Sequence, residues 1–250
     1  MMTRRKFLAL GALAVPGAAA AHASLGSRHL RVRRVSLREN GVRLVHFTDF
    51  HYKGDAAYAE RVIRTINELK PEFVCFTGDL VEEARFASEA RAFIRRIEAP
   101  VFGSPGNHDY RAGAPFTMFY EAFATTRGAW LADRSLVLPQ HDLEIVGMGA
   151  GGIHAFRPPA ATRRLLLLHY PQMADTLDGA KFDLILAGHS HGGQVRLPFY
   201  GAPFLPWGVG PYDLGYFETK GGPLYVNPGI GTYQISWRFN CRPEVTLLTL

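Results

Sequence analysis

From residue 29 onward, short apolar runs alternate along the chain with amphipathic stretches. Runs such as 42–49 (VRLVHFTD) and 72–79 (EFVCFTGD) are rich in Val and Phe and predict buried strands. In the stretches 58–70 and 84–98 the apolar residues recur at helical spacing, and a proline follows each stretch, where a helix commonly ends. Strands joined by helices of this length pair in parallel, and the helices then cover the sheet.

The second half of the chain is richer in predicted strands. Its extended segments are 143–150, 164–171, 182–189, 193–198, 223–229 and 243–250, with Gly and Pro between them. After residue 29 there is no low-complexity linker, no internal repeat and no break in composition. We therefore predict one α/β domain over residues 30–250, in which a central sandwich of two mixed β-sheets is flanked by helices.

The first 23 residues follow a different pattern, with a basic start, an apolar run over 7–21 and small residues at the end. The run is too short and too rich in Ala and Gly for a firm membrane span. The letters AHA at 21–23 fit a cleavage site, and TRRKFLA at 3–9 is similar to a twin-arginine export signal. We expect residues 1–23 to direct export to the periplasm or cell envelope. The alternative is that they are retained uncleaved as a membrane anchor.

Composition narrows the class of protein. An apolar content of 47% supports a sizeable core, and 28 Lys and Arg against 22 Asp and Glu give a formal net charge of +6. Part of the basic excess lies in the first 43 residues, and a basic terminus with a solvated surface explains it better than a nucleic-acid groove. Cys75 and Cys241 do not form a disulfide framework in a chain of this length, and we expect no bridge between them.

Polar side chains follow the apolar runs at five successive strand ends. They are Asp49, His51, Asp79, Asn107, His108, Asp109, His169, His189 and His191. Ligands bind beyond the carboxyl ends of strands in such sheets, and carboxylate, amide and imidazole groups are ligands of divalent first-row metals. Taken singly, each residue has an ordinary explanation as a turn former, a helix cap or a surface group. Together, they predict a metal site.

The spacing of these residues also suggests how they meet. Residues two apart on an extended segment point the same way, so Asp49 with His51, and His189 with His191, are expected to converge. Glycines beside Asp79 and at other strand ends permit close backbone approach. The absence of cysteine ligands argues against a structural zinc site.

Five short motifs stand in order: DFH, GDL, GNHD, LLLLHYP and GHSH, between residues 49 and 191. This series resembles that of the calcineurin-like metallophosphoesterases. The segments GHSHGGQVRLP and LYVNPGIGTYQISWRFN are similar to the bacterial YkuE/YaeI-like branch, which is related to LpxG-type UDP-2,3-diacylglucosamine pyrophosphatases. The resemblance implies a four-layer α/β/β/α fold and two divalent metal ions, which would be Mn, Fe or Zn.

The resemblance also implies a role for each residue. The first metal would be held by Asp49, His51 and His191, the second by Asn107, His169 and His189, and Asp79 would bridge them. His108 would contact phosphate and protonate the leaving group, and Asp109 would orient His108. The implied activity is hydrolysis of a phosphodiester, phosphomonoester or pyrophosphate bond by attack of a metal-bridging hydroxide. Around the first motif, Tyr52 and Lys53 depart from the usual pattern and leave local substrate contacts open.

The substrate is less determined than the reaction. The segment 198–215 is crowded with aromatic residues, Pro and Gly, and is either a packed loop or an apolar lip for an acyl chain, a nucleobase or a membrane surface. We expect a phosphorylated small molecule or a lipid-linked substrate. Nucleic acid is disfavoured because the chain has no added capping domain. Two other classes stay open, a catalytically silent metal-binding scaffold and a membrane-anchored adaptor, although the complete set of ligand positions argues against a silent scaffold.

Overall fold

The architecture comes from a computed structural model that describes residues 26–150, 158–177 and 179–250. The segment expected to direct export, residues 1–23, lies outside the described residues. Among the described residues, no helix is long and apolar enough to cross a membrane.

The first of two six-stranded sheets has the strand order β1-β12-β2-β3-β4-β5. Its strands are β1 (Arg31–Ser36), β2 (Arg43–Phe47), β3 (Phe73–Phe76), β4 (Val101–Gly103), β5 (Ala129–Trp130) and β12 (Glu244–Thr249). Strands β2 to β5 are parallel, as the strand–helix–strand pattern predicts, while β12 runs antiparallel to β2. The last strand of the chain thus lies between β1 and β2, which places the segment before it beside the ends of the parallel strands.

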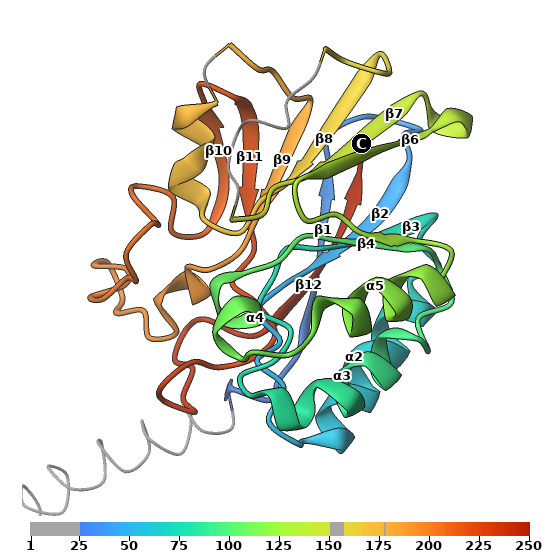
Figure 1. Cartoon of the computed structure of the whole chain (residues 1–250). Coiled ribbons are helices and arrows are strands. Elements are labelled where there is room, and N and C mark those ends of the chain that lie inside the picture. Colours follow the sequence, from blue (N-terminus) through green and yellow to red (C-terminus); the bar gives the residue numbers. More distant parts are fainter. Residues whose placement is uncertain (1–25, 151–157, 178) are drawn as a thin grey trace, which may run out of the picture.

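The second sheet has the order β10-β11-β9-β8-β7-β6. Its strands are β6 (Arg134–Leu138), β7 (Leu143–Gly147), β8 (Arg163–Leu167), β9 (Leu184–Ala187), β10 (Gly215–Thr219) and β11 (Gly222–Val226). The four central strands are parallel, and the edge strands β6 and β10 are antiparallel to their neighbours. The two sheets face each other as the layers of a sandwich (Figure 1), which confirms the predicted fold class.

Alternation along the strands fills both faces of each sheet. In β3, Phe73 and Cys75 pack between the sheets, while Val74 and Phe76 pack on the opposite face. In β8, the successive leucines alternate in the same way between the inter-sheet core and the outer face. Because side chains of a strand point alternately to its two faces, an unbroken apolar run is required wherever both faces are covered.

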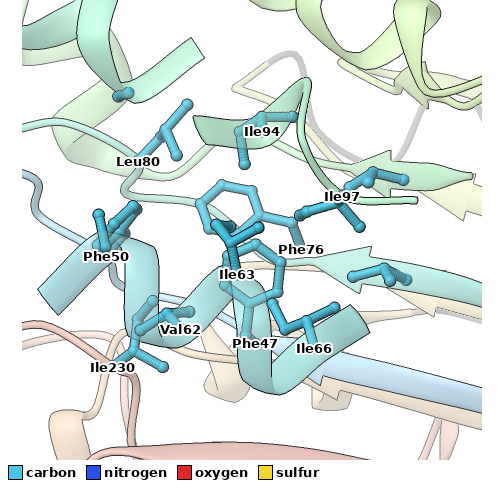
Figure 2. Close-up of a cluster of buried hydrophobic side chains, with 14 of the residues drawn as sticks. Phe47, Phe50, Val62, Ile63, Ile66, Phe76, Leu80, Ile94, Ile97 and Ile230 are labelled. Atoms are coloured by element: carbon cyan, nitrogen blue, oxygen red, sulfur yellow. The ribbon is translucent and has the colours of Figure 1, made fainter. Parts of the chain in front are cut away.

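Helices cover the outer face of the first sheet. They are α2 (Ala56–Glu68), α3 (Ala87–Ile94) and α5 (Phe116–Thr125), together with the short helices η1 (Ala84–Phe86) and α4 (Asn107–Arg111). The side chain of Asp55 caps α2 by accepting a hydrogen bond from the Tyr58 amide. Figure 2 shows how Val62, Ile63 and Ile66 of α2 pack on Phe47 and Phe76 of the sheet.

The second sheet is covered differently. In the part of the chain that the structure describes, its outer core packs against the 3₁₀ helix η4 (Pro171–Thr176) and irregular loops, with Ala174, Leu177 and Tyr212 buried there. Two further 3₁₀ turns, η2 (Pro139–His141) and η5 (His191–Gly193), follow strands β6 and β9.

Some local predictions were wrong at their edges. The helix predicted over 84–98 divides into η1 and α3. The segment 193–198 is not a strand: it makes only isolated bridges, because Gly192, Gly193 and Gln194 take positive φ values and turn the backbone away. Cys75 and Cys241 are both free, so they form no bridge with each other, and both are buried.

Replacing Ile66 by alanine is expected to lower the free energy of unfolding by about 2–5 kcal/mol, because its side chain is completely buried between α2 and the sheet. Denaturant unfolding monitored by circular dichroism measures the change. The matched control is Arg64→Ala on the exposed face of the same helix, which should stay near wild type. Similar losses for both variants would contradict the assigned packing.

Candidate metal centre

The loops that follow β2, β3, β4, β8 and β9 bring the predicted site residues to one end of the sandwich. Nearly all are buried, and only Asn107 and His189 keep partial exposure. Three groups of His and Asp there have ligand atoms within 4.8 Å of one another and could hold a metal ion. The groups are Asp49 with His51 and His191, His51 with Asp79 and His108, and Asp79 with His169 and His189.

The first donor group lies between the loops after β2 and β9. His51 Nε2 lies 3.2 Å from His191 Nε2, and Asp49 Oδ1 lies 3.3 Å from His191 Nε2. Two atoms that bind one ion at about 2.1 Å lie roughly 3.0–3.4 Å apart, so this spacing fits the edges of a coordination shell. The donor set is therefore suited to a divalent cation of the first transition row.

The second donor group is formed by the loops after β4, β8 and β9. His169 Nε2 lies 3.2 Å from Asn107 Oδ1 and 3.1 Å from His189 Nδ1. The spacing again matches ligands that share one ion. Asn107 is the first residue of helix α4, which fixes the backbone that carries its amide side chain.

Asp79 connects the two groups. Its Oδ2 atom lies 3.4 Å from His51 Nε2 and 3.2 Å from His169 Nε2, while its Oδ1 atom accepts a hydrogen bond from the His108 amide at 2.7 Å. One carboxylate oxygen thus faces both donor groups, and the other fixes its orientation. Such a carboxylate can contact two ions at once.

Hydrogen bonds on the far side of three imidazoles fix which nitrogen faces the centre. His51 Nδ1 lies 2.6 Å from Glu82 Oε2, His169 Nδ1 lies 2.7 Å from the Thr77 carbonyl, and His189 Nε2 lies 2.7 Å from the Trp207 carbonyl. In its neutral form each ring donates its N–H to this oxygen, which leaves a lone pair on the nitrogen that faces the centre. This arrangement is typical of metal-binding histidines.

The backbone produces the convergence in an unexpected way. Extended segments were expected at Asp49 with His51 and at His189 with His191, but these four residues and Asp79 all have φ between 44° and 65°. For residues with a side chain this left-handed region costs about 1–3 kcal/mol each. The strain is held by neighbouring loops, because the Asp49 amide donates to the Gly78 carbonyl at 2.9 Å and the His51 amide to the Asp79 carbonyl at 3.0 Å.

Two glycines are required by close packing against the carboxylates. A Cβ at Gly106 would collide with the carboxylate of Asp79, and one at Gly188 would collide with Thr48 and with the carboxylate of Asp49. The predicted function of these glycines, to let the loops approach, therefore fits the structure.

Asp109 does not contact the centre directly. Its carboxylate accepts three backbone hydrogen bonds of 2.8 Å, from the amides of Asp79, Leu80 and Gly106. Burial, and after it the charge of Asp79, raises the pKa of Asp109 to about 7. The residue thus ties the loop after β3 to the loop after β4, which also carries His108.

The electrostatics of the centre favour a cation. Burial opposes the charged form of His51, yet hydrogen bonds to Asp49 and Glu82 raise its pKa to about 10. Burial likewise opposes the charged form of His169, but the charge of Asp79 raises its pKa to about 9. Burial and the neighbouring His169 lower the pKa of His189 to about 4, so that ring is neutral and able to act as a ligand.

Several residues around the centre were not found from the sequence. Glu82 lies three positions after Asp79, and its carboxylate contacts both His51 and His108, with 3.3 Å from Oε2 to His108 Nδ1. Its position three residues after Asp79 is a sequence signal that could have identified Glu82. Arg238 is buried and donates hydrogen bonds to the carbonyls of Pro228 and Gly231, which hold the segment beside Asp49. The carbonyl of Trp207 belongs to the backbone and leaves no trace in the sequence.

A cavity of about 270 Å³ opens above the donor groups. Besides the ligand residues, its walls include Arg111, Tyr170, Trp207 and Tyr233. The ring of Tyr233 lies 4.8 Å from that of His108. Tyr52, which the sequence left open as a substrate contact, is instead buried in the core and donates its hydroxyl to Glu89.

Comparison with known proteins places this arrangement in a family. The family model for calcineurin-like phosphoesterases matches residues 42–193, which include every donor residue named above. The chain is 32% identical to the uncharacterized metallophosphoesterase YkuE of Bacillus subtilis (strain 168), with 100% of this chain and 98% of the relative covered.

Two further relatives have names that describe an activity. The phosphodiesterase YaeI of Escherichia coli (strain K12) is 28% identical, with 100% of both chains covered. The UDP-2,3-diacylglucosamine pyrophosphatase LpxG of Chlamydia trachomatis is 25% identical, with 84% of this chain and 83% of the relative covered. The match to the family model, together with the full-length similarity to YkuE, shows that this chain belongs to the calcineurin-like phosphoesterases, a family of hydrolases.

Proposed function

We propose that the chain holds two divalent metal ions and uses them to hydrolyse a phosphodiester or pyrophosphate bond. The observation that carries this proposal is the position of the Asp79 carboxylate, with one oxygen within 3.4 Å of His51 Nε2 and 3.2 Å of His169 Nε2. Asp49, His51 and His191 would hold one ion, and Asn107, His169 and His189 the other. When bound, such ions supply charge for phosphoryl oxygens and lower the pKa of water.

The remaining side chains of the cavity would bind and orient the phosphoryl group. Arg111 lines the cavity with an exposed guanidinium, a group suited to bidentate contact with phosphate. His108 lies beside His51 and Tyr233, with its Nδ1 toward Glu82, which leaves Nε2 to give a proton to the departing oxygen. Burial lowers the pKa of His108 below its ordinary value of 6.5, so a proton on this ring is readily released.

An apolar groove next to the cavity supports a substrate with a lipid or another apolar group. The groove holds about 330 Å³ and shares His191, Pro206 and Tyr233 with the walls of the metal cavity. Phe204, Leu205 and Ile235 also line the groove. The relative LpxG is named for a diacylated substrate. Wild-type rates on bis(p-nitrophenyl) phosphate, UDP-lipid, phospholipid and nucleotide substrates would distinguish the substrate classes.

Asp79→Ala is expected to lower the bound metal below two ions per chain and to reduce hydrolysis of bis(p-nitrophenyl) phosphate. Loss of a bridging ligand should remove several kcal/mol of transition-state stabilisation, roughly a thousandfold in rate. Elemental analysis of the purified protein and a rate assay with added Mn²⁺ measure both effects. Glu83→Gln, an exposed carboxylate close by, is the control. Two ions per chain in the Asp79 variant would disprove the bridging role.

His108→Ala is expected to keep both metals but to slow hydrolysis of substrates with poor leaving groups by roughly 10²–10⁴-fold, the usual contribution of a general acid. Substrates with good leaving groups, which do not need a proton, should be slowed much less. A series of aryl phosphodiesters of graded leaving-group pKa makes the comparison. Equal losses along the series would show that His108 is not the acid.

Glu82→Gln is expected to weaken metal binding by roughly 10–100-fold, because the neutral amide supports His51 and His108 less well than a carboxylate. Titration of the metal-free protein with Mn²⁺ gives the affinity. Glu83→Gln is again the matched control, since the exposed side chain of that neighbour pairs with the exposed Arg85. Glu82→Asp, which keeps the charge, should recover part of the loss; an unchanged affinity in Glu82→Gln would exclude the role.

A further inference from the structure

Two loops beside the metal cavity expose large apolar side chains to solvent. The exposed fractions are 112% for Phe199, 84% for Phe204 and 86% for Trp207 in one loop, and 49% for Ile235 and 50% for Trp237 in the other. With Tyr200, these residues are called the aromatic patch below. Neither the segment 197–212 nor the segment 229–237 contains a charged residue. Soluble surfaces rarely gather so many large apolar side chains unless they contact another phase or partner.

The aromatic patch stands on a fixed scaffold. The side chain of Gln194 joins the two loops: its amide donates to the Tyr233 carbonyl at 2.9 Å, and its carbonyl accepts from the Tyr233 amide at 2.7 Å. Arg196 donates to Asp213 at 2.8 Å and to the Gly192 carbonyl at 3.0 Å. Arg196 and Asp213, the charged groups at the base of the loops, are thus paired with each other, and the exposed side chains of the segments 197–212 and 229–237 are uncharged.

The aromatic patch is continuous with the candidate metal centre. Trp207 lines the metal cavity, and its carbonyl accepts a hydrogen bond from His189. Phe204 and Ile235 line the apolar groove, which shares His191, Pro206 and Tyr233 with the walls of that cavity. A surface in contact with the patch would therefore lie at the mouth of the cavity.

The first residue of the described chain, Gly26, lies next to the loop that carries Trp237. Gly26 packs directly against the carbonyl of Arg238, the residue after Trp237. The residues that precede it include the basic triplet 4–6 and the apolar run 7–21. Figure 1 shows the blue start of the described chain close to the red segment before β12.

We propose that the aromatic patch docks on the surface of a lipid bilayer and holds the mouth of the metal cavity against the headgroups. Trp and Tyr prefer the boundary between water and hydrocarbon, where the ring is buried and the polar atom stays hydrated. The loops carry no charge that would have to be desolvated on insertion. The formal net charge of +6 favours a membrane that contains anionic lipid. Docking on a protein partner or on a second copy of the chain would not depend on lipid being present.

The three tryptophans allow a direct test on the full chain. Trp130 is buried in the core at 1% exposure, so a change on adding lipid reports Trp207 and Trp237. Vesicles of phosphatidylcholine and phosphatidylglycerol in equal parts are expected to shift the emission to shorter wavelength and to protect it from acrylamide. Brominated lipid should quench it. The variant with both Trp207→Phe and Trp237→Phe, which keeps only Trp130, should show none of these changes.

The double variant Phe199→Ser and Tyr200→Ser, at two exposed rings that line neither the metal cavity nor the apolar groove, is expected to weaken insertion of the tryptophans roughly tenfold or more, because two aromatic rings no longer move from water into the bilayer. Its rate on soluble bis(p-nitrophenyl) phosphate should stay at the wild-type level, which separates docking from the proposed hydrolysis. Val137→Ser on the edge strand β6 is the control.

Two results would overturn the proposal. The chain could float with vesicles while Trp207 and Trp237 remain fully open to acrylamide; the apolar run alone would then hold the membrane. Alternatively, the emission could shift with protein concentration and without lipid, which would assign the aromatic patch to a second copy of the chain.

Discussion

The structure depends on one electrostatic constraint: buried carboxylates and imidazoles at the centre require positive charge between them. Asp49 and Asp79 are almost completely removed from water, and bare carboxylates at that depth are very costly. The pKa values of His51 and His169 are raised for the same reason, because the neighbouring carboxylates favour a positive charge on those rings. A divalent cation would balance the charge of the carboxylates better than protons on these two rings, and its binding would release those protons.

The two-sheet sandwich supplies the rigidity that this centre needs. The carboxyl ends of strands β2, β3 and β4 of the first sheet and of β8 and β9 of the second lie at the same end of the sandwich. Each loop is then fixed to its neighbours by backbone hydrogen bonds, and Asp109 joins two of them through three amides. This support holds the left-handed backbone of the ligand residues, a conformation that an isolated loop would not keep.

The same support explains which residues the sequence analysis could and could not identify. The ligand residues stand at strand ends within short motifs, so their chemistry is visible in the order of residues. Glu82 carried a weaker indication, its spacing from Asp79. Arg238 and the Trp207 carbonyl act through contacts between segments that are distant in sequence, and the conformation of Gln194 follows from packing rather than from any local pattern.

By itself, the sequence determined the parallel strand–helix pattern, the two-sheet fold class and the set of nine candidate site residues, because hydrophobic periodicity and ligand chemistry are local properties of the chain. The tertiary structure decided the rest. It showed that left-handed turns, and not extended segments, bring Asp49 to His51 and His189 to His191. It also exposed Phe199, Trp207 and Trp237 on two loops whose residues 203–206 and 233–235 line the apolar groove next to the cavity. Those features arise from contacts between segments that are far apart in the sequence, and local sequence patterns do not show which distant segments come together.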